Sequence, residues 1–190
     1  MAEDDQASPG PRPDIERLST RLVYENRWLR LREDRVRRRD GSEGIYGVVE
    51  KADFVVVVPV HEDGSITLVQ QFRYPVGERL WEFCQGIWGG PGADPEEAAR
   101  HELAEETGLA AATLTHLGFL WEGAGQMRQG FDVFLATGLT AGPARPEAEE
   151  QDLISRRIPR AELERMLREG EIRDAVTLAA WGLMAAKGLL

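Results

Sequence analysis

Residues 94–109, DPEEAARHELAEETGL, decide the fold because they carry both the start and the stop signal of a helix. Asp94 is a good N-cap residue, and Pro95 suits the first helical position because its fixed φ matches the helix. Gly108 follows the last turn, where a glycine in the left-handed conformation ends many helices. The stretch therefore predicts one helix that ends at Thr107.

The same helix carries three glutamates in an arrangement that does not stabilise a helix by itself. Glu102 and Glu106 lie about 40° apart, one turn above the other, and Glu105 adds a third carboxylate. Like charges at this spacing repel, and the helix dipole disfavours anions in the last turn. A divalent cation reverses the sign of both effects, and oxygen-only ligands favour Mg²⁺ or Mn²⁺ over zinc. Ala99 and Leu103 are expected on the other side of the helix, so that the glutamate face is separate from the core face. The alternative is a solvated acidic face, as in many surface helices.

Strand signals flank this helix on both sides. Upstream, the apolar run DFVVVVPV at 53–60 is typical of a strand that is buried on both faces. Further strands are predicted at 65–74, 80–86, 113–121, 131–139 and 152–159, and further helices at 159–170 and 174–189. Strands mixed with three helices predict an α/β fold in which a mixed sheet is sandwiched between helices.

The beginning of the chain differs from the rest in composition and pattern. Residues 1–14 are rich in Pro, Gly, Ser and acidic residues, which predicts a disordered tail. Residues 15–51 contain three partly alternating segments that read as an N-terminal antiparallel β extension. So small a sheet needs to pack on the main domain, residues 52–190, or on a second subunit. We therefore expect the extension to serve in dimerisation.

The charge balance restricts the partners. Lys and Arg number 23 and Asp and Glu 33, which gives a formal net charge of −10. This balance argues against a protein that coats nucleic acid or anionic lipid, so we expect no nucleic-acid or membrane partner. The single cysteine, Cys84, excludes an internal disulfide and suits a reducing compartment. With no apolar signal core or long apolar run, we expect a cytoplasmic location.

The segment ELAEETGL at 102–109 resembles the end of the Nudix box. From Ala52 to Leu189 the chain is similar to the ADP-ribose pyrophosphatase-like branch of Nudix hydrolases. This resemblance implies a Nudix α/β/α sandwich over 52–190 and a homodimer, since the N-terminal strands of this branch commonly reach across to the partner subunit. The other blocks that carry the resemblance are QQFRYP (70–75), LWEFCQG (80–86) and FDVFLATGL (131–139).

The resemblance implies Mg²⁺- or Mn²⁺-dependent hydrolysis of the diphosphate bond of a nucleoside diphosphate sugar, ADP-ribose or a relative, to two phosphorylated products. It assigns metal ligation to Glu102 and Glu106, with a backbone carbonyl near Gln85 as a further ligand. Glu105 is implied as a ligand or as a carboxylate that orients one, and either Glu105 or Glu106 as the general base. All three glutamates are therefore expected to be catalytic.

Four other residues match substrate positions of the family. Arg73 is implied as a phosphate contact, for which a guanidinium fork is suited, and the alternative is a surface salt bridge, with Glu78 as a candidate partner. Glu82 matches a glutamate of the substrate pocket, and the alternative is an outward-facing strand residue. Trp28 and Tyr46 match aromatic residues that stack on adenine, and the alternative is packing in the core or at a dimer interface.

The sequence departs from the family pattern at three places. Ala93 stands where the first box glutamate is expected, and His101 stands where the arginine is expected and is a candidate charge partner for the helix glutamates. The loop glutamate that often serves as general base has Gln129 as its nearest match, which we assign to substrate binding because an amide accepts a proton poorly. Such a degenerate box leaves a second hypothesis, a Nudix-fold module that binds or senses a nucleotide and turns it over weakly.

Overall fold

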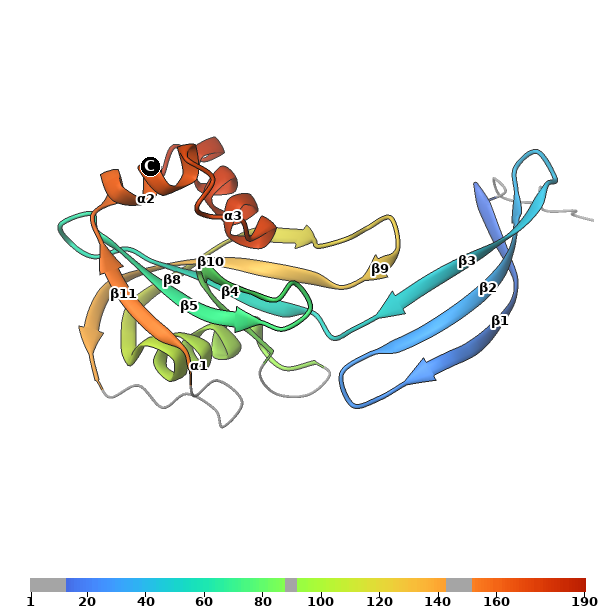
Figure 1. Ribbon diagram of the computed structural model, residues 1–190, viewed down its shortest axis with the longest axis horizontal. Helices are drawn as coiled ribbons and strands as arrows, with labels where there is room; N and C mark the ends of the chain where they lie inside the picture. Colours follow the sequence, from blue (N-terminus) through green and yellow to red (C-terminus); the bar gives the residue numbers. More distant parts are fainter. Residues whose placement is uncertain (1–12, 88–91, 143–151) are drawn as a thin grey trace, which may run out of the picture. The chain divides into compact units, whose positions relative to one another are not determined.

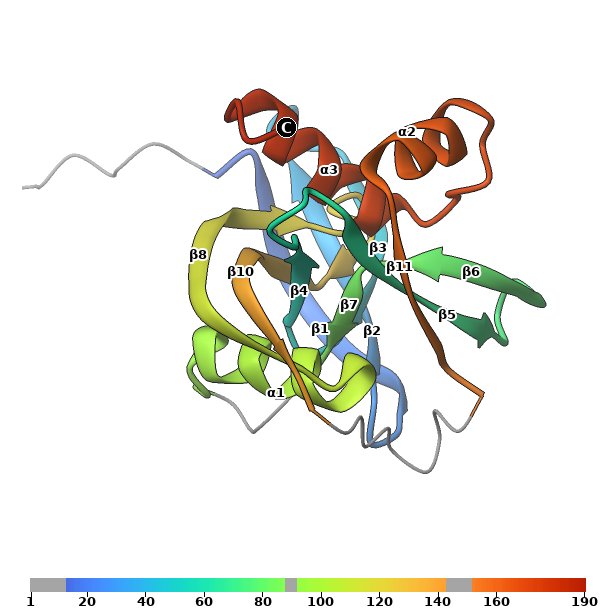
Figure 2. The same ribbon diagram turned by 90° about the vertical axis from the view of Figure 1, so that its left-hand side faces the viewer.

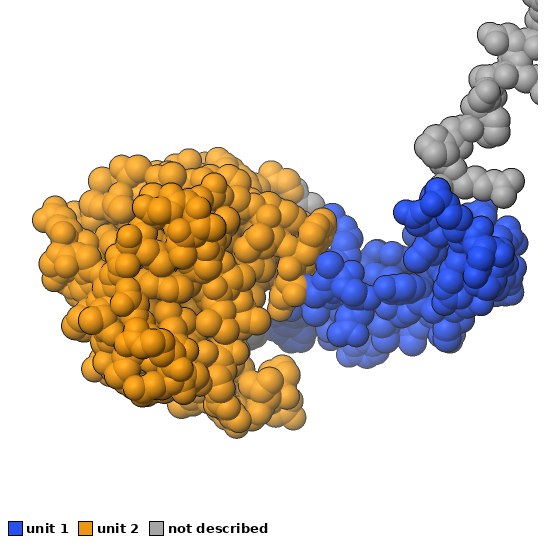
Figure 3. All heavy atoms as spheres, turned by 90° about the horizontal axis from the view of Figure 1, so that it is seen from above, with its two compact units in different colours: residues 1–51, 123–128 blue, residues 52–122, 129–190 orange. Residues whose placement is uncertain are grey.

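The computed structural model describes residues 13–87, 92–142 and 152–190. The chain divides into two compact units, which are coloured separately in Figure 3. The first unit contains the chain up to Lys51 together with Gly123–Arg128, and the second contains Ala52–Glu122 and Gln129–Leu190. Of the predicted tail, residues 1–12 lie outside the described residues.

The first unit is a sheet of order β1-β2-β3-β9. The first three strands pair antiparallel, which confirms the predicted N-terminal β extension. A turn at Asp40 and Gly41 joins β2 to β3, and Gly41 has the positive φ of +86° that such a turn requires. The sequence did not predict β9, which pairs parallel with β3. The strands are β1 (Ile15–Glu25), β2 (Arg30–Arg38), β3 (Glu43–Glu50) and β9 (Met127–Arg128).

Within the described residues the second unit contains two sheets and three helices (Figure 1). The central sheet has the order β7-β4-β10-β8, and the side sheet has the order β11-β5-β6. The central sheet is mixed, because β10 pairs parallel with β4 and antiparallel with β8. The elements are β4 (Phe54–Pro59), β5 (Ile66–Arg73), β6 (Glu78–Glu82), β7 (Cys84–Gly86), α1 (Pro95–Thr107), β8 (Leu109–Trp121), β10 (Gly130–Ala141), β11 (Ile154–Ile158), α2 (Arg160–Arg168) and α3 (Ala175–Ala186).

Helices cover the central sheet on both faces (Figure 2). Val55 and Val57 of β4 pack in one apolar cluster with Leu103 of α1. Val56 and Val58 belong to a second cluster, which contains residues of α2 and α3. Because successive residues of a strand point to opposite faces, β4 needs an unbroken apolar sequence to fill both clusters. The predicted α/β/α sandwich is thereby confirmed.

The prediction of one continuous strand at 80–86 is wrong. These residues form two strands, since β6 ends at Glu82 and pairs with β5 of the side sheet, while β7 begins at Cys84 and pairs with β4 of the central sheet. Phe83 lies between them and is fully buried. The chain therefore passes from one sheet to the other at Phe83, which puts Glu82 and Gln85 on different sheets.

The helices begin and end at the residues that cap them. Asp94 accepts a hydrogen bond from the backbone N–H of Glu96 at 3.0 Å, and Gly108 ends α1 with a φ of +69°, as predicted. Asp174 caps α3 by accepting a hydrogen bond from the backbone N–H of Thr177 at 2.7 Å. In the part of the chain that the structure describes, every helix is too short or too polar to cross a membrane.

Candidate active site

Of the three glutamates in the second half of α1, Glu102, Glu105 and Glu106, two are almost fully buried. Glu102 is 7% exposed and Glu106 is 1% exposed, so the alternative of a solvated acidic face is wrong. Their face is also continuous with the apolar one, since Ala99 and Leu103 of the same helix are fully buried. An ionised carboxylate loses much hydration when it is buried, and it is stable only where cations or hydrogen-bond donors compensate the charge.

Both buried carboxylates lie against β7. Oε2 of Glu106 accepts a hydrogen bond from the backbone N–H of Gln85 at 3.2 Å. The carboxylate of Glu102 is so close to Gly86 that a Cβ on Gly86 would lie 2.6 Å from Cδ of Glu102. Glycine is the one residue that leaves room for this approach. Strand β7 therefore brings the two carboxylates of α1 to one place.

Glu105, the remaining glutamate of the predicted site, has a different partner. The side chain of Glu105 is 12% exposed, and its Oε2 lies 3.0 Å from Nδ1 of His101. His101 therefore contacts one of the helix glutamates, and its role as a charge partner stays a prediction. Across residues 13–87, 92–142 and 152–190, no group of three or more His, Cys, Asp or Glu is arranged to hold a metal ion. A metal would therefore depend on Glu102 and Glu106 together with other oxygen donors.

The donors around β7 fit Mg²⁺ or Mn²⁺ rather than a softer metal. Besides the two carboxylates, the side-chain Oε1 of Gln85 is buried and accepts no hydrogen bond from any described residue. The neighbouring sulfur is that of Cys84, which is fully buried. Burial raises the pKa of the Cys84 thiol well above its usual range, and the charges of Glu106 and Glu102 raise it further. The two carboxylates and the amide of Gln85 offer oxygen donors, which are the ligands that Mg²⁺ and Mn²⁺ prefer.

A second buried carboxylate site lies on β6, where Glu82 is 1% exposed. The alternative that Glu82 faces outward is thus wrong. The strand register places Arg73 opposite Glu78 and Glu82 opposite Val69, so the side chain of Arg73 runs back along the sheet. Its Nε lies 2.9 Å from Oε1 and its Nη2 2.5 Å from Oε2 of Glu82. The alternative partner Glu78 is wrong, because Glu78 pairs with Arg173.

The surroundings of Arg73 keep it charged. Burial by itself lowers the pKa of Arg73, but the hydrogen bonds and charge of Glu82 raise it, and the charges of Asp174 and Glu106 add to the increase, so that the pKa is raised overall. The side chain of Arg73 is still 36% exposed, whereas that of Glu82 is 1% exposed. The buried carboxylate of Glu82 therefore holds the guanidinium of Arg73 in place, and part of that guanidinium remains exposed to solvent.

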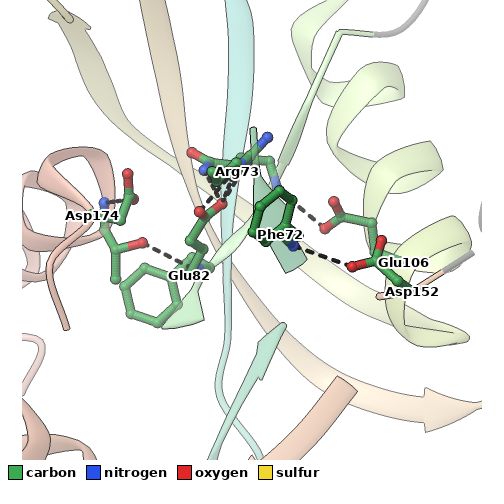
Figure 4. A network of polar contacts seen from close by, with 9 residues as sticks. Phe72, Arg73, Glu82, Glu106, Asp152 and Asp174 are labelled. Atoms are coloured by element: carbon green, nitrogen blue, oxygen red, sulfur yellow. Dashed lines mark hydrogen bonds and ion pairs between the residues drawn. The ribbon is translucent and has the colours of Figure 1, made fainter. Parts of the chain in front are cut away.

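Gln85 joins the two carboxylate sites. Its Nε2 donates a hydrogen bond to Oε2 of Glu82 at 2.6 Å, while its backbone N–H donates to Glu106. A chain of hydrogen bonds thus runs from Arg73 through Glu82 and Gln85 to Glu106, and Figure 4 shows Arg73 facing Glu82 with Glu106 on the neighbouring helix. The structure therefore brings together Arg73, Glu82, Gln85, Glu102 and Glu106 from the predicted set.

Gln129 has a contact with the backbone. It is 2% exposed, and its Nε2 donates a hydrogen bond to the carbonyl oxygen of Ala52 at 2.7 Å. Next to it, the backbone N–H of Gly130 donates to Oδ1 of Asp53 at 2.8 Å. These bonds hold the start of β10 against the start of β4. The substrate-binding role of Gln129 stays a prediction.

Trp28 and Tyr46 belong to the first unit. Trp28 is 58% exposed and Tyr46 39% exposed, so packing in a core of this chain is wrong, while packing at a dimer interface stays a prediction. The guanidinium of Arg27 lies 4.0 Å from the ring centroid of Trp28, and the hydroxyl of Tyr46 donates to the carbonyl oxygen of Gly125 at 2.7 Å. Their predicted role in stacking on a nucleotide base stays a prediction.

Two residues near the site were not found by sequence reasoning. Thr177 of α3 accepts a hydrogen bond from the backbone N–H of Phe83, and Asp174 contributes to the electrostatics of Arg73. The sequence marks Asp174 as a helix start, but no local signal connects α3 with residue 83. Only the packing of α3 on the central sheet brings the two segments together.

Comparisons with known proteins match both parts of the chain. The family model described as "NUDIX domain" matches residues 51–180, and the model described as "Nucleoside diphosphate sugar hydrolase N-terminal domain" matches residues 15–49. The ADP-ribose pyrophosphatase of Mycobacterium tuberculosis is 36% identical over 168 residues, which cover 87% of this chain and 81% of that protein. The ADP-ribose pyrophosphatase of Bacillus subtilis is 26% identical over 166 residues, with coverage of 86% and 88%.

More distant similarities agree in fold. A GDP-mannose pyrophosphatase of an Enterobacter species is 30% identical over 138 residues, which cover 68% of this chain and 71% of that protein. Among solved structures, a crystal structure of an ADP compounds hydrolase superposes with a TM-score of 0.81 at 21% identity. It covers 96% of this chain and 100% of the other. At that identity the superposition supports the fold alone.

Proposed function

This chain belongs to the Nudix hydrolases of the ADP-ribose and nucleoside diphosphate sugar pyrophosphatase family, and on that premise we propose that it hydrolyses the diphosphate bond of ADP-ribose or a related nucleotide sugar. The products are two phosphate monoesters. Relatives named for ADP-ribose and for GDP-mannose support a nucleotide sugar as the substrate class.

One observation carries this proposal. The hydrogen-bonded chain from Arg73 to Glu106 joins a charged, partly exposed guanidinium to a pair of buried carboxylates within one unit of the protein. A diphosphate needs a cation that binds its oxygens and a site that neutralises its charge while water attacks. Arg73 supports the first requirement, and the buried carboxylates, which are suited to hold a metal cation, support the second.

Glu102 and Glu106 are the residues that would hold a divalent cation, with an oxygen of Gln85 as a further donor. When bound, such a cation neutralises the diphosphate and lowers the pKa of a coordinated water. The chain's own contribution is to fix the two carboxylates, through the close approach of Gly86 and the backbone N–H of Gln85. Carboxylates that are held in place need little reorganisation when their charge is used.

Arg73 is suited to bind a phosphate oxygen of the substrate. Its Nε and Nη2 are bonded to Glu82, which fixes the plane of the guanidinium while leaving its exposed edge for an anion. A guanidinium that is held in this way loses less conformational entropy on binding than a free one. The buried Glu82 thus acts through Arg73, as well as being a candidate contact for the substrate.

The general base is proposed to be Glu105 or Glu106. Glu105 is more accessible, with 12% of its side chain exposed, and its contact with His101 keeps its carboxylate oriented. Gln129 is not suited to this task, because an amide accepts a proton poorly. The departures Ala93 and His101 are part of the same proposal, in which the box is degenerate and a helix carboxylate takes over the role of the base.

The first unit is proposed to serve in dimerisation and in binding the nucleotide base. It presents Trp28 and Tyr46 as exposed aromatic residues, and β1 and β3 carry further exposed apolar side chains, including Leu22 and Ile45. Exposed apolar side chains on a sheet with so little core of its own are typical of a surface that a partner covers. A homodimer in the cytoplasm remains our expectation.

The second candidate function is a Nudix-fold module that binds a nucleotide and turns it over weakly. The observation that favours it is Gln129, which is an amide at the position expected for the base and is bonded to the backbone of Ala52. In that case the same groups would bind the diphosphate, and only the hydrolytic step would be slow.

The test is an assay of the purified chain with Mg²⁺ and a panel of ADP-ribose, ADP-glucose and GDP-mannose. We expect phosphate monoesters from at least one of them, and a loss of at least about 100-fold in kcat for Glu106→Gln. Glu97→Gln is the matched control, because Glu97 lies on the same helix and is exposed. Calorimetric binding of a nucleotide sugar without turnover in the wild type would favour the binding module. If the wild type shows no binding and no turnover, both candidate functions are contradicted.

A further inference from the structure

The chain changes sheets at Phe83, and a backbone group there needs a partner from elsewhere. Phe83 is outside both β6 and β7, and it is fully buried. A buried backbone N–H that lacks a hydrogen bond is destabilising, so a position between two sheets has to be satisfied by another element. The N–H of Phe83 donates to Oγ1 of Thr177 at 3.0 Å.

Thr177 is itself held in place. It is 0% exposed, and its own backbone N–H donates to Oδ2 of the N-cap residue Asp174 at 2.7 Å. A β-branched side chain in a helix has few allowed rotamers, so its hydroxyl is a rigid acceptor. The first turn of α3 thus provides a fixed point for the backbone at Phe83.

The residues on either side of Phe83 belong to the candidate active site. Glu82 precedes it and binds Arg73, while Gln85 follows two residues later and contacts both Glu82 and Glu106. Asp174 reaches the same group electrostatically, since its charge helps to raise the pKa of Arg73. Figure 4 shows Asp174 on the opposite side of Glu82 from Glu106. Any rotation of the backbone at Phe83 would therefore change the position of Glu82 relative to β7.

We propose that Thr177 is a positioning residue, whose hydroxyl fixes the change of sheet at Phe83 and thereby holds the Arg73–Glu82 pair in register with the carboxylates of α1. The hydroxyl acts through the backbone and does not touch the substrate. Its effect on the Arg73–Glu82 pair is a property of the folded chain, whereas its effect on substrate binding rests on the proposed function. The two effects are therefore tested separately.

The first test observes Arg73 directly by NMR in the full chain, with the Arg73 Nε–H resonance identified by its loss in Arg73→Lys. Thr177→Val removes the acceptor at almost constant volume, and we expect solvent exchange of the Arg73 Nε–H to accelerate by about tenfold or more. Thr177→Ser keeps the hydroxyl and should restore slow exchange. If Thr177→Val does not fold, Thr177→Cys, whose sulfur is a weaker acceptor, should show a smaller acceleration.

The matched control is Thr67→Val. Thr67 is a buried threonine of β5 whose Oγ1 lies 2.8 Å from Nε2 of His61, so the variant also loses a hydroxyl contact. It should lower the melting temperature and leave the exchange of the Arg73 Nε–H unchanged. The proposal is overturned if Thr177→Val lowers the melting temperature in the same way but leaves that exchange unchanged.

The second test uses steady-state kinetics with Mg²⁺ and whichever of ADP-ribose, ADP-glucose and GDP-mannose the wild type hydrolyses. A displaced Arg73 should raise KM by about fivefold or more in Thr177→Val while kcat changes less, with recovery in Thr177→Ser and no change in Thr67→Val. An unchanged KM with an active wild type contradicts the positioning of the substrate contact. A wild type without any turnover contradicts the proposed function instead, and the NMR measurement still decides the role of Thr177.

Discussion

At the scale of single residues, the site depends on a carboxylate that water does not reach. Glu82 is 1% exposed, and its charge is compensated by Arg73 and by the amide of Gln85. Removing the cation of such a pair leaves a buried charge without compensation, which costs far more than breaking an exposed pair. The same strand provides the comparison, since Glu78 and Arg173 form an exposed pair at its other end.

We therefore expect Arg73→Ala to lower the free energy of unfolding by about 2 kcal/mol, and Arg173→Ala by less than about 1 kcal/mol. Urea unfolding at pH 7 measures both. The double variant Arg73→Ala/Glu82→Gln should recover part of the loss, because the uncompensated charge is gone. Equal losses in the two single variants would show that burial of Glu82 has no energetic consequence.

The residues of the candidate site could be predicted from the sequence more readily than the residues with which they pair. The spacing of Glu102, Glu105 and Glu106 indicated a site, because like charges one helix turn apart need a reason to be there. The partner of Arg73 was not predictable from the local sequence. The register places it opposite Glu78, and only its long side chain allows it to reach Glu82.

At the scale of elements, the contact between α1 and β7 determines how close two carboxylates come. Gly86 makes this contact possible, since a Cβ there would lie 2.6 Å from Cδ of Glu102. The three-residue length of β7 follows from the change of sheet at Phe83, which also separates Glu82 from Gln85. Arg73 and Glu82 are the last residues of β5 and β6, and Glu106 lies in the last turn of α1, so several of the functional groups are placed by the ends of elements.

Gly86→Ala should displace the carboxylate of Glu102 and lower kcat for the nucleotide sugar by at least about tenfold, while the far-UV circular dichroism of the chain stays unchanged. Gly182→Ala in α3 is the control, since an added Cβ there meets no atom within 4 Å and alanine favours a helix. The control should keep full activity and melt at the same or a higher temperature. Full activity of Gly86→Ala would mean that the close approach is not needed.

The ends of α1 could be predicted from the sequence, but the break between β6 and β7 could not. The caps of α1 were predictable because Asp94, Pro95 and Gly108 act through local backbone geometry. The break between β6 and β7 was not, since LWEFCQG has no proline or internal glycine to mark it. Phe83 leaves its strand because a distant hydroxyl, that of Thr177, accepts its N–H.

At the scale of the whole molecule, the chain is built from two units with different surfaces. The second unit contains the apolar clusters and the candidate active site. The first unit has few buried side chains, and its strands expose apolar residues that include Leu22 at 49% and Ile45 at 67%. A sheet with so little core of its own is stabilised when its exposed apolar side chains are covered.

We expect the full chain to be a dimer by size-exclusion chromatography with light scattering. Ile45→Glu should shift it toward monomer, because the charge would have to be buried at the interface. Ile154→Glu is the control, since Ile154 is 50% exposed on β11 of the second unit. A monomeric wild type, or a dimer that Ile45→Glu does not weaken, would contradict dimerisation through the first unit.

If Glu102 and Glu106 are buried together in order to bind a divalent cation, calorimetric titration with Mg²⁺ should detect that cation. The chain is first saturated with a non-hydrolysable methylene analogue of ADP-ribose. We expect saturable Mg²⁺ uptake by the wild type and by Glu97→Gln, with an affinity at least about tenfold weaker in Glu102→Gln and in Glu106→Gln. Uptake of equal affinity in all four proteins, or no uptake by the wild type, would contradict this role of Glu102 and Glu106.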